Sequence, residues 1–310
     1  MKKILLTGAC GFIGRHLLAR LLQCSDYHVR CLDRFKATWL SPASRVQFIE
    51  ADFCAPHVME EAIAGCDTIV HLISTTLPQT SNDDPAYDTQ TNLIGTISML
   101  DLAVKHKVRR FLYASSGGTI YGNPQSDIIS ENHPTNPRCS YGIVKLAVEK
   151  YLRLYHEIHG LSTLVLRLAN PFGEHQRTDN KFGVISTFCH KAVLDECIEI
   201  WGDGTVIRDF IYISDLIDAL IAALTSPLTG TEINIGSGKG YSINEVIATI
   251  EKVLRRKIRT ELLPARNFDV PKVVLDISQA ERLLRWHPRI PLEEGIRNTL
   301  SYHQELTTRG

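Results

Sequence analysis

The chain has 310 residues, of which 44% are hydrophobic, and its 34 Lys and Arg residues balance its 34 Asp and Glu residues. A chain of this length can bury a sizeable core in one large domain or in two closely joined ones. The balanced charge argues against nucleic acid or an anionic membrane surface as a main partner, and no apolar run approaches membrane-spanning length.

The first predicted elements are a strand, a glycine-rich turn and a helix. In KKILLTGACGFIGRHLLARLLQC an apolar run leads to Gly8, Gly11 and Gly14 and then to apolar residues at helical spacing. Gly8 permits a sharp turn, Gly11 leaves room for a pyrophosphate, and Gly14 lets the helix pack closely on the strand. The phosphates would lie at the helix N-terminus, in whose first turn we count Phe12 and Ile13 as cofactor-binding residues. An ordinary strand-to-helix turn is the alternative interpretation.

A second predicted strand, YHVRCLD, ends in Asp33, nineteen residues after Gly14. A carboxylate there can accept hydrogen bonds from the adenosine ribose hydroxyls of a dinucleotide and repels an added 2′-phosphate. This favours NAD over NADP. Arg34 leaves NADP open, because a guanidinium next to Asp33 could bind that phosphate.

Along the chain, strand-like runs alternate with amphipathic segments. Including the two strands above, these runs are residues 3–7, 28–33, 46–50, 68–73, 110–115 and 163–169. This alternation predicts an α/β fold, a Rossmann-like doubly wound parallel sheet that binds ligands at the carboxyl ends of its strands. We expect an NAD-binding domain over 1–170, with a strand near 232–236 returning to the sheet. Residues 171–310 should form a smaller mixed substrate-binding region, and 170–183 should be a polar loop.

Tyr141 and Lys145 are four residues apart in a helical pattern. This spacing places both side chains on one helix face, where the ammonium would favour the phenolate and lower the pKa of Tyr141. A phenolate of this kind can remove a proton from a sugar or alcohol hydroxyl. The alternative is a chance pairing on an ordinary helix.

The cysteines and histidines predict a reduced protein without a metal site. The eight cysteines form no CxxC pair, which favours free thiols in the cytoplasm. Cys10 in the glycine turn is the one candidate for oxidation, and an ordinary small loop residue is the favoured alternative for it. His156 and His159 could share a helix face, but zinc needs at least three ligands. Thr7 interrupts the first apolar run, so that run predicts a buried strand rather than a signal peptide.

These motifs together resemble the extended short-chain dehydrogenase/reductase family, and within it the UDP-glucose/UDP-galactose 4-epimerases and their nucleotide-sugar relatives. The resemblance covers nearly the whole chain. The matching segments are TGACGFIG at Thr7, Asp33, Asp52-Phe53, HLI at His71, NLIGT at Asn92, SSGGTIYG at Ser115, YGIVK at Tyr141, RLANPFG at Arg167, WGDG at Trp201, RDFIYISD at Arg208 and NIGSG at Asn234.

The resemblance implies further residues that bind NAD. Asp52 and Phe53 would contact the adenine, and Leu72 and Ile73 would line the cofactor cleft; a place in the core is the alternative for Leu72 and Ile73. Asn92 would brace the sheet and the cofactor; capping the helix that follows it is an equal alternative. The lysine of the YGIVK motif would bind the nicotinamide ribose as well as tune the tyrosine.

The family completes its active site with a Ser or Thr three residues before a VYG-like motif, and in this chain that position is Gly117. The available hydroxyls are Ser115, Ser116 and Thr119. We expect Ser116 to bind the reacting oxygen, with Thr119 as second candidate; a serine that caps the end of the strand is the alternative.

The same segment bears on the reaction. Dehydratases of the family carry an Asp-Glu pair where this chain has Gly118 and Thr119, and the decarboxylases use a Glu at the second position. The reactions of the family that need no such carboxylate require only NAD and one group that shuttles a proton. Epimerisation of a UDP-hexose at C4 through a 4-keto intermediate is a reaction of this kind. An NAD(P)-dependent nucleotide-sugar ketoreductase or dehydrogenase and a noncatalytic nucleotide-sensing protein are the alternatives.

The substrate contacts are implied by the resemblance as well. Asn170, Arg208, Arg266 and Asp269 would hold the diphosphate and uridine, where the planar guanidinium suits phosphate oxygens. An ion pair with a nearby aspartate is the alternative role for Arg208. Val273 would leave room for an N-acetyl group, so N-acetylhexosamines are possible substrates. The resemblance also implies a homodimer and a place in polysaccharide synthesis.

Overall fold

The computed structural model describes residues 2–24, 26–35, 37–39, 45–178, 183–265 and 270–309. The chain divides into two compact units, one of residues 1–120, 137–167 and 220–233, the other of residues 121–136, 168–219 and 234–310. Each unit therefore combines separate stretches of the chain on both sides of residue 170. No helix among the described residues is long and apolar enough to cross a membrane.

The largest sheet has seven strands in the order β10-β6-β5-β4-β1-β2-β3. The pairings of β1 with β2 and β4, of β2 with β3, and of β4 with β5 are parallel. Ile4, Leu5 and Leu6 of β1 are all buried, as expected for a central strand covered on both faces. The predicted α/β fold is confirmed. The strands are β1 (Lys2–Thr7), β2 (Tyr27–Asp33), β3 (Val46–Glu50), β4 (Thr68–His71), β5 (Arg110–Ser116), β6 (Ser162–Leu168) and β10 (Thr231–Ile235).

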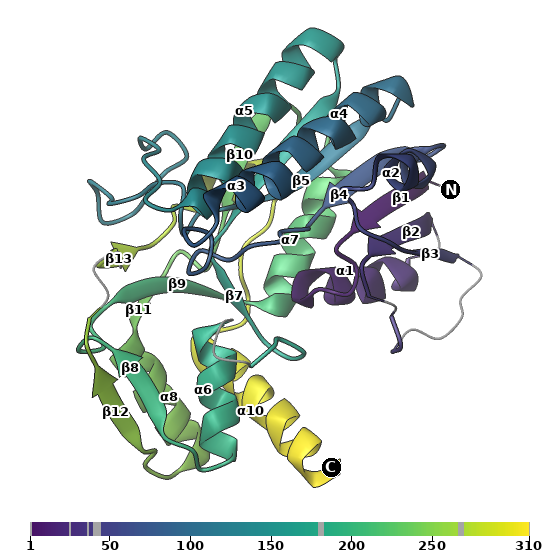
Figure 1. The fold of residues 1–310 in the computed structure, drawn as a ribbon. Helices are drawn as coiled ribbons and strands as arrows, with labels where there is room; N and C mark the ends of the chain where they lie inside the picture. Colours follow the sequence, from purple (N-terminus) through teal and green to yellow (C-terminus); the bar gives the residue numbers. More distant parts are fainter. Residues whose placement is uncertain are drawn as a thin grey trace. The chain divides into compact units, whose positions relative to one another are not determined.

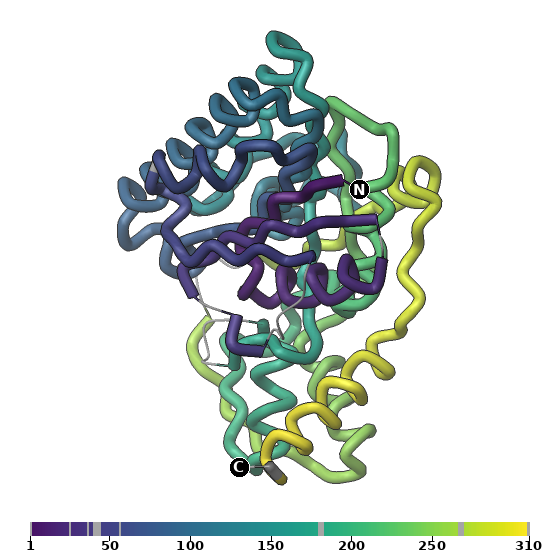
Figure 2. The backbone as a smooth tube through the Cα atoms, turned by 90° about the vertical axis from the view of Figure 1, so that its right-hand side faces the viewer, coloured from purple at the N-terminus to yellow at the C-terminus, as the bar shows by residue number. Residues whose placement is uncertain are grey.

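Helices cover both faces of this sheet, as Figures 1 and 2 show. The helices α2 (Pro56–Ile63), α4 (Gly95–Lys105) and α5 (Ser140–His159) lie side by side on one face, and α1 (Phe12–Gln23) lies on the other. The short helix α3 (Pro85–Asp88) continues into a π-helical turn, η1 (Thr89–Ile94), which leads into α4. Helix α7 spans Ile213–Thr225.

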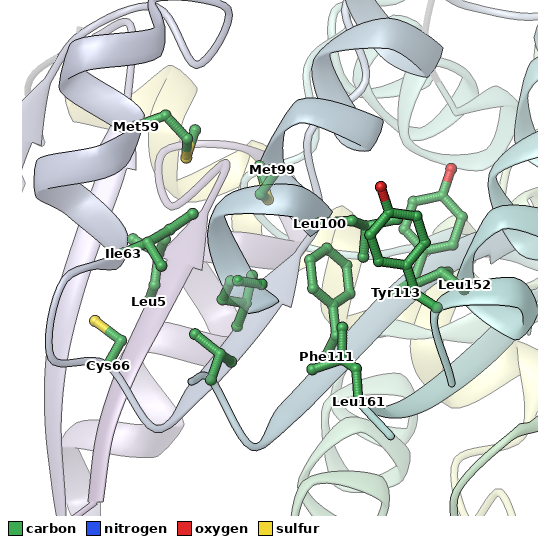
Figure 3. Close-up of a cluster of buried hydrophobic side chains, with 14 of the residues drawn as sticks. Leu5, Met59, Ile63, Cys66, Met99, Leu100, Phe111, Tyr113, Leu152 and Leu161 are labelled. Atoms are coloured by element: carbon green, nitrogen blue, oxygen red, sulfur yellow. The ribbon is translucent and has the colours of Figure 1, made fainter. Parts of the chain in front are cut away.

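A cluster of buried side chains fixes α2, α4 and α5 to the sheet (Figure 3). Met59 of α2, Met99 of α4 and Leu152 of α5 belong to this cluster together with Phe111 and Tyr113 of β5, and each is at most 3% exposed. Burial of one such side chain stabilises the fold by roughly 1.5–3 kcal/mol. This packing sets the position of α5 relative to the end of β5.

The second unit contains two small sheets. In one, β9 (Ile207–Tyr212) pairs with β7 (Asn170–Phe172), β11 (Gly240–Ser242) and β13 (Lys272–Val273); in the other, β8 (Ile198–Trp201) pairs with β12 (Thr260–Leu263). Residues 170–172 were expected to be loop, but they form a strand because β9 offers them a parallel partner. The helices are α6 (Val184–Val193), α8 (Ile243–Leu254), α9 (Ser278–Leu284) and α10 (Leu292–Arg309).

Candidate active site

The glycine turn joins β1 to α1 as predicted, and its geometry requires glycine. Gly8 has a φ of +76°, in the left-handed region that favours glycine. A Cβ at Gly14 would lie 2.0 Å from the carbonyl oxygen of Gly8, so any side chain there would push the helix off the turn. Gly11 is the N-cap of α1 and makes no side-chain cap bond. The first N–H groups of α1 therefore remain available to an anion such as a diphosphate.

Asp33 lies at the carboxyl end of β2, beside this turn. Its carboxylate accepts hydrogen bonds from the backbone N–H of Cys10 at 2.9 Å and of Phe35 at 3.3 Å. A carboxylate has about four acceptor positions, so Asp33 keeps capacity for two ribose hydroxyls. Arg34 is exposed. These residues fit the adenosine half of a dinucleotide.

Cys10 does not have the environment of a reactive thiol. Its Sγ donates to the carbonyl of Phe35, and burial together with the charge of Asp33 raises the pKa of Cys10 to about 11. A thiol with so high a pKa carries almost no thiolate at neutral pH. The structure gives no support to its selective oxidation.

Leu72 and Ile73 follow β4 and lie against the glycine turn. A Cβ at Gly8 would be 3.2 Å from the backbone nitrogen of Ile73 and 3.3 Å from the carbonyl carbon of Leu72. Both residues are half-buried, so they are neither wholly core nor wholly exposed. The side chain of Phe53 is 4% exposed and belongs to the hydrophobic cluster, which leaves its backbone for a cofactor contact. Asp52 accepts a bond from the N–H of Cys54 at 2.9 Å.

Tyr141 and Lys145 lie in the first two turns of α5, on one face as predicted. The Nζ of Lys145 is 5.5 Å from the centre of the Tyr141 ring and 4.7 Å from the centre of the Tyr113 ring. It donates a hydrogen bond to the carbonyl of Ala114 at 2.8 Å. Lys145 is only 5% exposed, and burial lowers its pKa to about 8, although the nearby carboxylates of Asp88 and Glu149 oppose that shift.

The expected lowering of the Tyr141 pKa is wrong for this structure. Burial is the largest influence and raises the pKa of Tyr141 above its ordinary value, and Cys139 and Asp88 act in the same direction. The hydroxyls of Ser116 and Ser74 lower this pKa through hydrogen bonding. The physical reason is that removal of the phenol from water disfavours its charged form more than the neighbouring dipoles favour it.

Ser115 and Ser116 end β5 and Thr119 follows it, and the surroundings of their three hydroxyls differ. Ser115 donates to the carboxylate of Glu149, which forms a buried ion pair with Arg167 at 2.8 Å, so Ser115 is held by the core. The hydroxyl of Ser116 lies close enough to the Tyr141 phenol to lower the pKa of that phenol. The Oγ1 of Thr119 is buried without a hydrogen-bond partner in the part of the chain that the structure describes. Of the three, Ser116 is the one brought to the phenol.

Asn92 lies in the π-helical turn and does not cap α4, whose N-cap is Ile94. Its Oδ1 accepts from the N–H of Thr75 at 2.9 Å, and its Nδ2 donates to Asp88 at 2.8 Å. The capping interpretation is therefore wrong. Asn92 instead fixes the segment after β4 to the start of α4, which agrees with a bracing role.

Three of the residues expected to bind the UDP-sugar, Asn170, Arg208 and Val273, lie in the second unit. The Nδ2 of Asn170 donates to the carbonyl of Asp209 at 2.9 Å, and Nη1 of Arg208 donates to the carbonyls of Ile207 and Val270 at 2.9 and 2.6 Å. Val273, in β13, is 3% exposed. Arg266 and Asp269 lie outside the described residues.

No cluster of three or more His, Cys, Asp or Glu side chains within the described residues is arranged to hold a metal ion. The Nδ1 of His156, near the end of α5, donates to the carbonyl of Leu161 at 3.0 Å. This contact ties the histidine to the short connection between α5 and β6.

Known proteins resemble the chain over almost its full length. The NAD dependent epimerase/dehydratase family model matches residues 4–236. A UDP-glucose 4-epimerase of Mycolicibacterium smegmatis is 30% identical over 313 residues, covering 97% of this chain and 98% of that protein. The structure of the UDP-glucose 4-epimerase of Thermotoga maritima with UDP-glucose has a TM-score of 0.93 and 30% identity, covering 98% of this chain and 99% of that one.

A second solved structure adds a dinucleotide. The UDP-glucuronic acid 4-epimerase of Bacillus cereus, in complex with UDP-glucuronic acid and NAD, has a TM-score of 0.91 and 30% identity, covering 98% of this chain and 99% of that one. With the glycine turn, the Tyr141–Lys145 pair and these matches in agreement, the chain belongs to the NAD dependent epimerase/dehydratase family.

Proposed function

We propose that this chain is an NAD-dependent 4-epimerase of a UDP-hexose, either UDP-glucose/UDP-galactose or the N-acetylhexosamine forms. The observation that carries this is the placement of Tyr141, Ser116 and Lys145 in the same unit as a glycine turn that only glycine can form. NAD, when bound, supplies the acceptor and donor of hydride. The family match and the epimerase structures support the same reaction class.

In this proposal the protein moves one proton and holds one oxygen. The Tyr141 oxygen takes the proton of the 4-hydroxyl as the C4 hydrogen leaves as hydride, and gives it back when the hydride returns to the other face of the ketone. Ser116 donates to the reacting oxygen. Lys145 keeps positive charge next to the phenolate. Atoms and electrons balance over the cycle, so no net oxidation occurs.

The remaining contacts are proposed by the same reasoning. Gly8, Gly11, Phe12, Ile13 and Gly14 would hold the diphosphate of NAD, Asp33 its ribose, and Asp52, Phe53, Leu72, Ile73, Asn92 and Lys145 the rest of the molecule. Asn170, together with Arg208, Arg266, Asp269 and Val273 from residues 171–310, would supply the UDP-sugar contacts. The burial of Val273 means that it would shape the sugar pocket through packing.

The homodimer and the cytoplasmic location are part of the proposal. Ile143, Leu154 and Ile158 of α5 are 56%, 43% and 64% exposed, and such apolar side chains on one helix commonly mark an interface. The eight cysteines are all free thiols, as in proteins of a reducing compartment.

The test is to incubate the purified protein separately with UDP-glucose, UDP-N-acetylglucosamine and UDP-glucuronate, without added cofactor, and follow C4 by NMR. Inversion at C4 supports the proposal. Product formation only in step with consumption or production of NADH would instead show a reductase or dehydrogenase. A Tyr141→Phe variant should lose roughly 10²–10⁴-fold in kcat; unchanged turnover would point to a different base.

A further inference from the structure

Asp88 is a buried carboxylate near Tyr141 that the proposed reaction does not use. It is the last residue of α3 and is 0% exposed. The donors that bond it among the described residues are the uncharged side chains of Thr76, Asn92 and Ser140. A carboxylate buried without an ion pair lowers stability unless its charge is compensated, so its placement calls for an explanation.

The hydrogen bonds of Asp88 join two elements of the candidate site. Its Oδ1 accepts from Thr76 Oγ1 at 2.7 Å and from Asn92 Nδ2 at 2.8 Å, and its Oδ2 accepts from Ser140 Oγ at 2.7 Å. Ser140 is the first residue of α5 and directly precedes Tyr141. One carboxylate therefore ties the turn that carries Asn92 to the turn that carries the proposed base.

Helix α5 depends on such outside contacts at its start. Its N-cap, Cys139, makes no side-chain cap bond, and the N–H of Ser140 is bonded instead by the Oδ1 of Asn82 at 2.9 Å. Both contacts to Ser140 thus come from the segment between β4 and α4. Loss of either should loosen the first turn of α5 rather than the whole helix.

The charge of Asp88 also acts on the site. Asp88 is the largest of the influences that raise the pKa of Lys145, with Glu149 second, and it raises the pKa of Tyr141 as well. The other groups that act on Tyr141 are Cys139, Ser116 and Ser74. Asp88 therefore stabilises the ammonium and opposes the phenolate.

We propose that Asp88 is a positioning residue of the active site, which holds the first turn of α5 in place and serves as the buried counter-charge of the Lys145 ammonium. This inference rests on the proposed function, because it concerns proton transfer at Tyr141. It assigns Asp88 no contact with substrate.

The decisive variant is Asp88→Asn, which keeps the size of the side chain and removes its charge. Without that charge, the phenol of Tyr141 and the ammonium of Lys145 both lose their protons at lower pH. The acid limb of the kcat profile, which reports the phenolate, and the alkaline limb, which reports the ammonium, should therefore both move to lower pH by roughly one pH unit. We expect kcat to fall and KM for the UDP-sugar to stay unchanged. The matched control is Asp84→Asn, the exposed N-cap of the same helix, where Asn caps as well as Asp and the limbs should not move.

The outcomes separate this inference from the proposed function. A wild-type protein that does not epimerise any UDP-sugar overturns the proposed function. An active wild type whose Asp88→Asn variant keeps both limbs in place overturns the role of Asp88. If that variant does not fold, Ser140→Ala removes only the bond to α5: a lower kcat with unmoved limbs supports the positioning role, and a wild-type kcat contradicts it.

Discussion

Burial acts in opposite directions on the two residues of the proposed catalytic pair. It lowers the pKa of Lys145 to about 8 and raises that of Tyr141. As the pH rises, the ammonium of Lys145 would therefore lose its proton at a lower pH than the phenol of Tyr141. The phenolate therefore needs further positive charge nearby, and the nicotinamide of NAD would carry one. The pair should titrate as a coupled unit, so the limbs of a pH profile belong to both residues together.

His303 gives a prediction on stability at the same scale. It lies in α10, is 3% exposed, and neither ring nitrogen has a hydrogen-bond partner among the described residues. Burial, reinforced by His190, lowers its pKa to about 4. Because this value is below that of an unfolded histidine, about 6.5, the fold should lose stability as the pH falls from about 6.5 towards 4.

We expect His303→Leu to remove part of this pH dependence, on the order of 2 kcal/mol. Urea unfolding at several pH values between 7.5 and 4.5 measures it. The wild type should lose stability more steeply than the variant over this range. Parallel curves would mean that His303 is not held neutral by the fold.

The glycine turn predicts different outcomes for two glycines. A Cβ at Gly14 would meet the Gly8 carbonyl oxygen at 2.0 Å, but a Cβ at Gly11 would be 3.2 Å from it. Gly14→Ala should therefore destabilise the protein by about 1–3 kcal/mol and release the dinucleotide, whereas Gly11→Ala should weaken dinucleotide binding with little change in Tm. Thermal melts with the absorbance ratio at 260 and 280 nm report both quantities. Equal Tm values for the two variants would contradict this account of the turn.

At the scale of elements, the hydrophobic pattern predicted most strands of the large sheet well. It missed elements that depend on contacts with other parts of the chain. The strands β1 to β6 are apolar enough to be recognised in the sequence, and they lie where they were expected. The strand at 170–172 was missed, because its formation depends on pairing with β9, which the local sequence does not reveal. The π-helical turn at 89–94 was missed for a similar reason, because the side chain of Asn92 in this turn bonds Thr75 and Thr76, which lie outside the local sequence.

The candidate site also contains residues that local motifs indicate and residues that only tertiary contacts bring into place. The glycines, Asp33, Tyr141 and Lys145 follow patterns of fixed local spacing, so the sequence indicates them directly. Ser74 and Asp88 have no such signal. Ser74 reaches the phenol, and Asp88 reaches Ser140, only because the segment after β4 packs next to the start of α5.

Asn82 allows a test of how α5 is held. Its side chain is exposed, yet its Oδ1 accepts from the first N–H of α5. Asn82→Ala should cost about 1 kcal/mol of stability, as for loss of a helix cap, and should lower kcat because the next residue along the helix is Tyr141. Urea unfolding and initial rates measure the two effects. A variant with unchanged stability and rate would show that the N-terminus of α5 is fixed without Asn82.

At the scale of the whole molecule, the first unit holds Tyr141, Lys145 and Ser116, which are proposed to act at the reacting oxygen. The other described residues proposed for the UDP-sugar, Asn170, Arg208 and Val273, belong to the second unit. This division follows from the fold, since parallel strands bring the glycine turn and the end of β5 to the same edge of one sheet. Substitutions in the second unit could then change which sugar is bound without changing the reaction.

The central claim is that one sugar molecule is oxidised and then reduced again at the same carbon by a dinucleotide that stays bound. The most direct test is turnover of UDP-glucose deuterated at C4, in ordinary water and without added cofactor, with the product examined by NMR and mass spectrometry. The account predicts UDP-galactose that retains the deuterium at C4, because the label travels as hydride and returns to its own carbon. Loss of the label to water, with inversion intact, would contradict it.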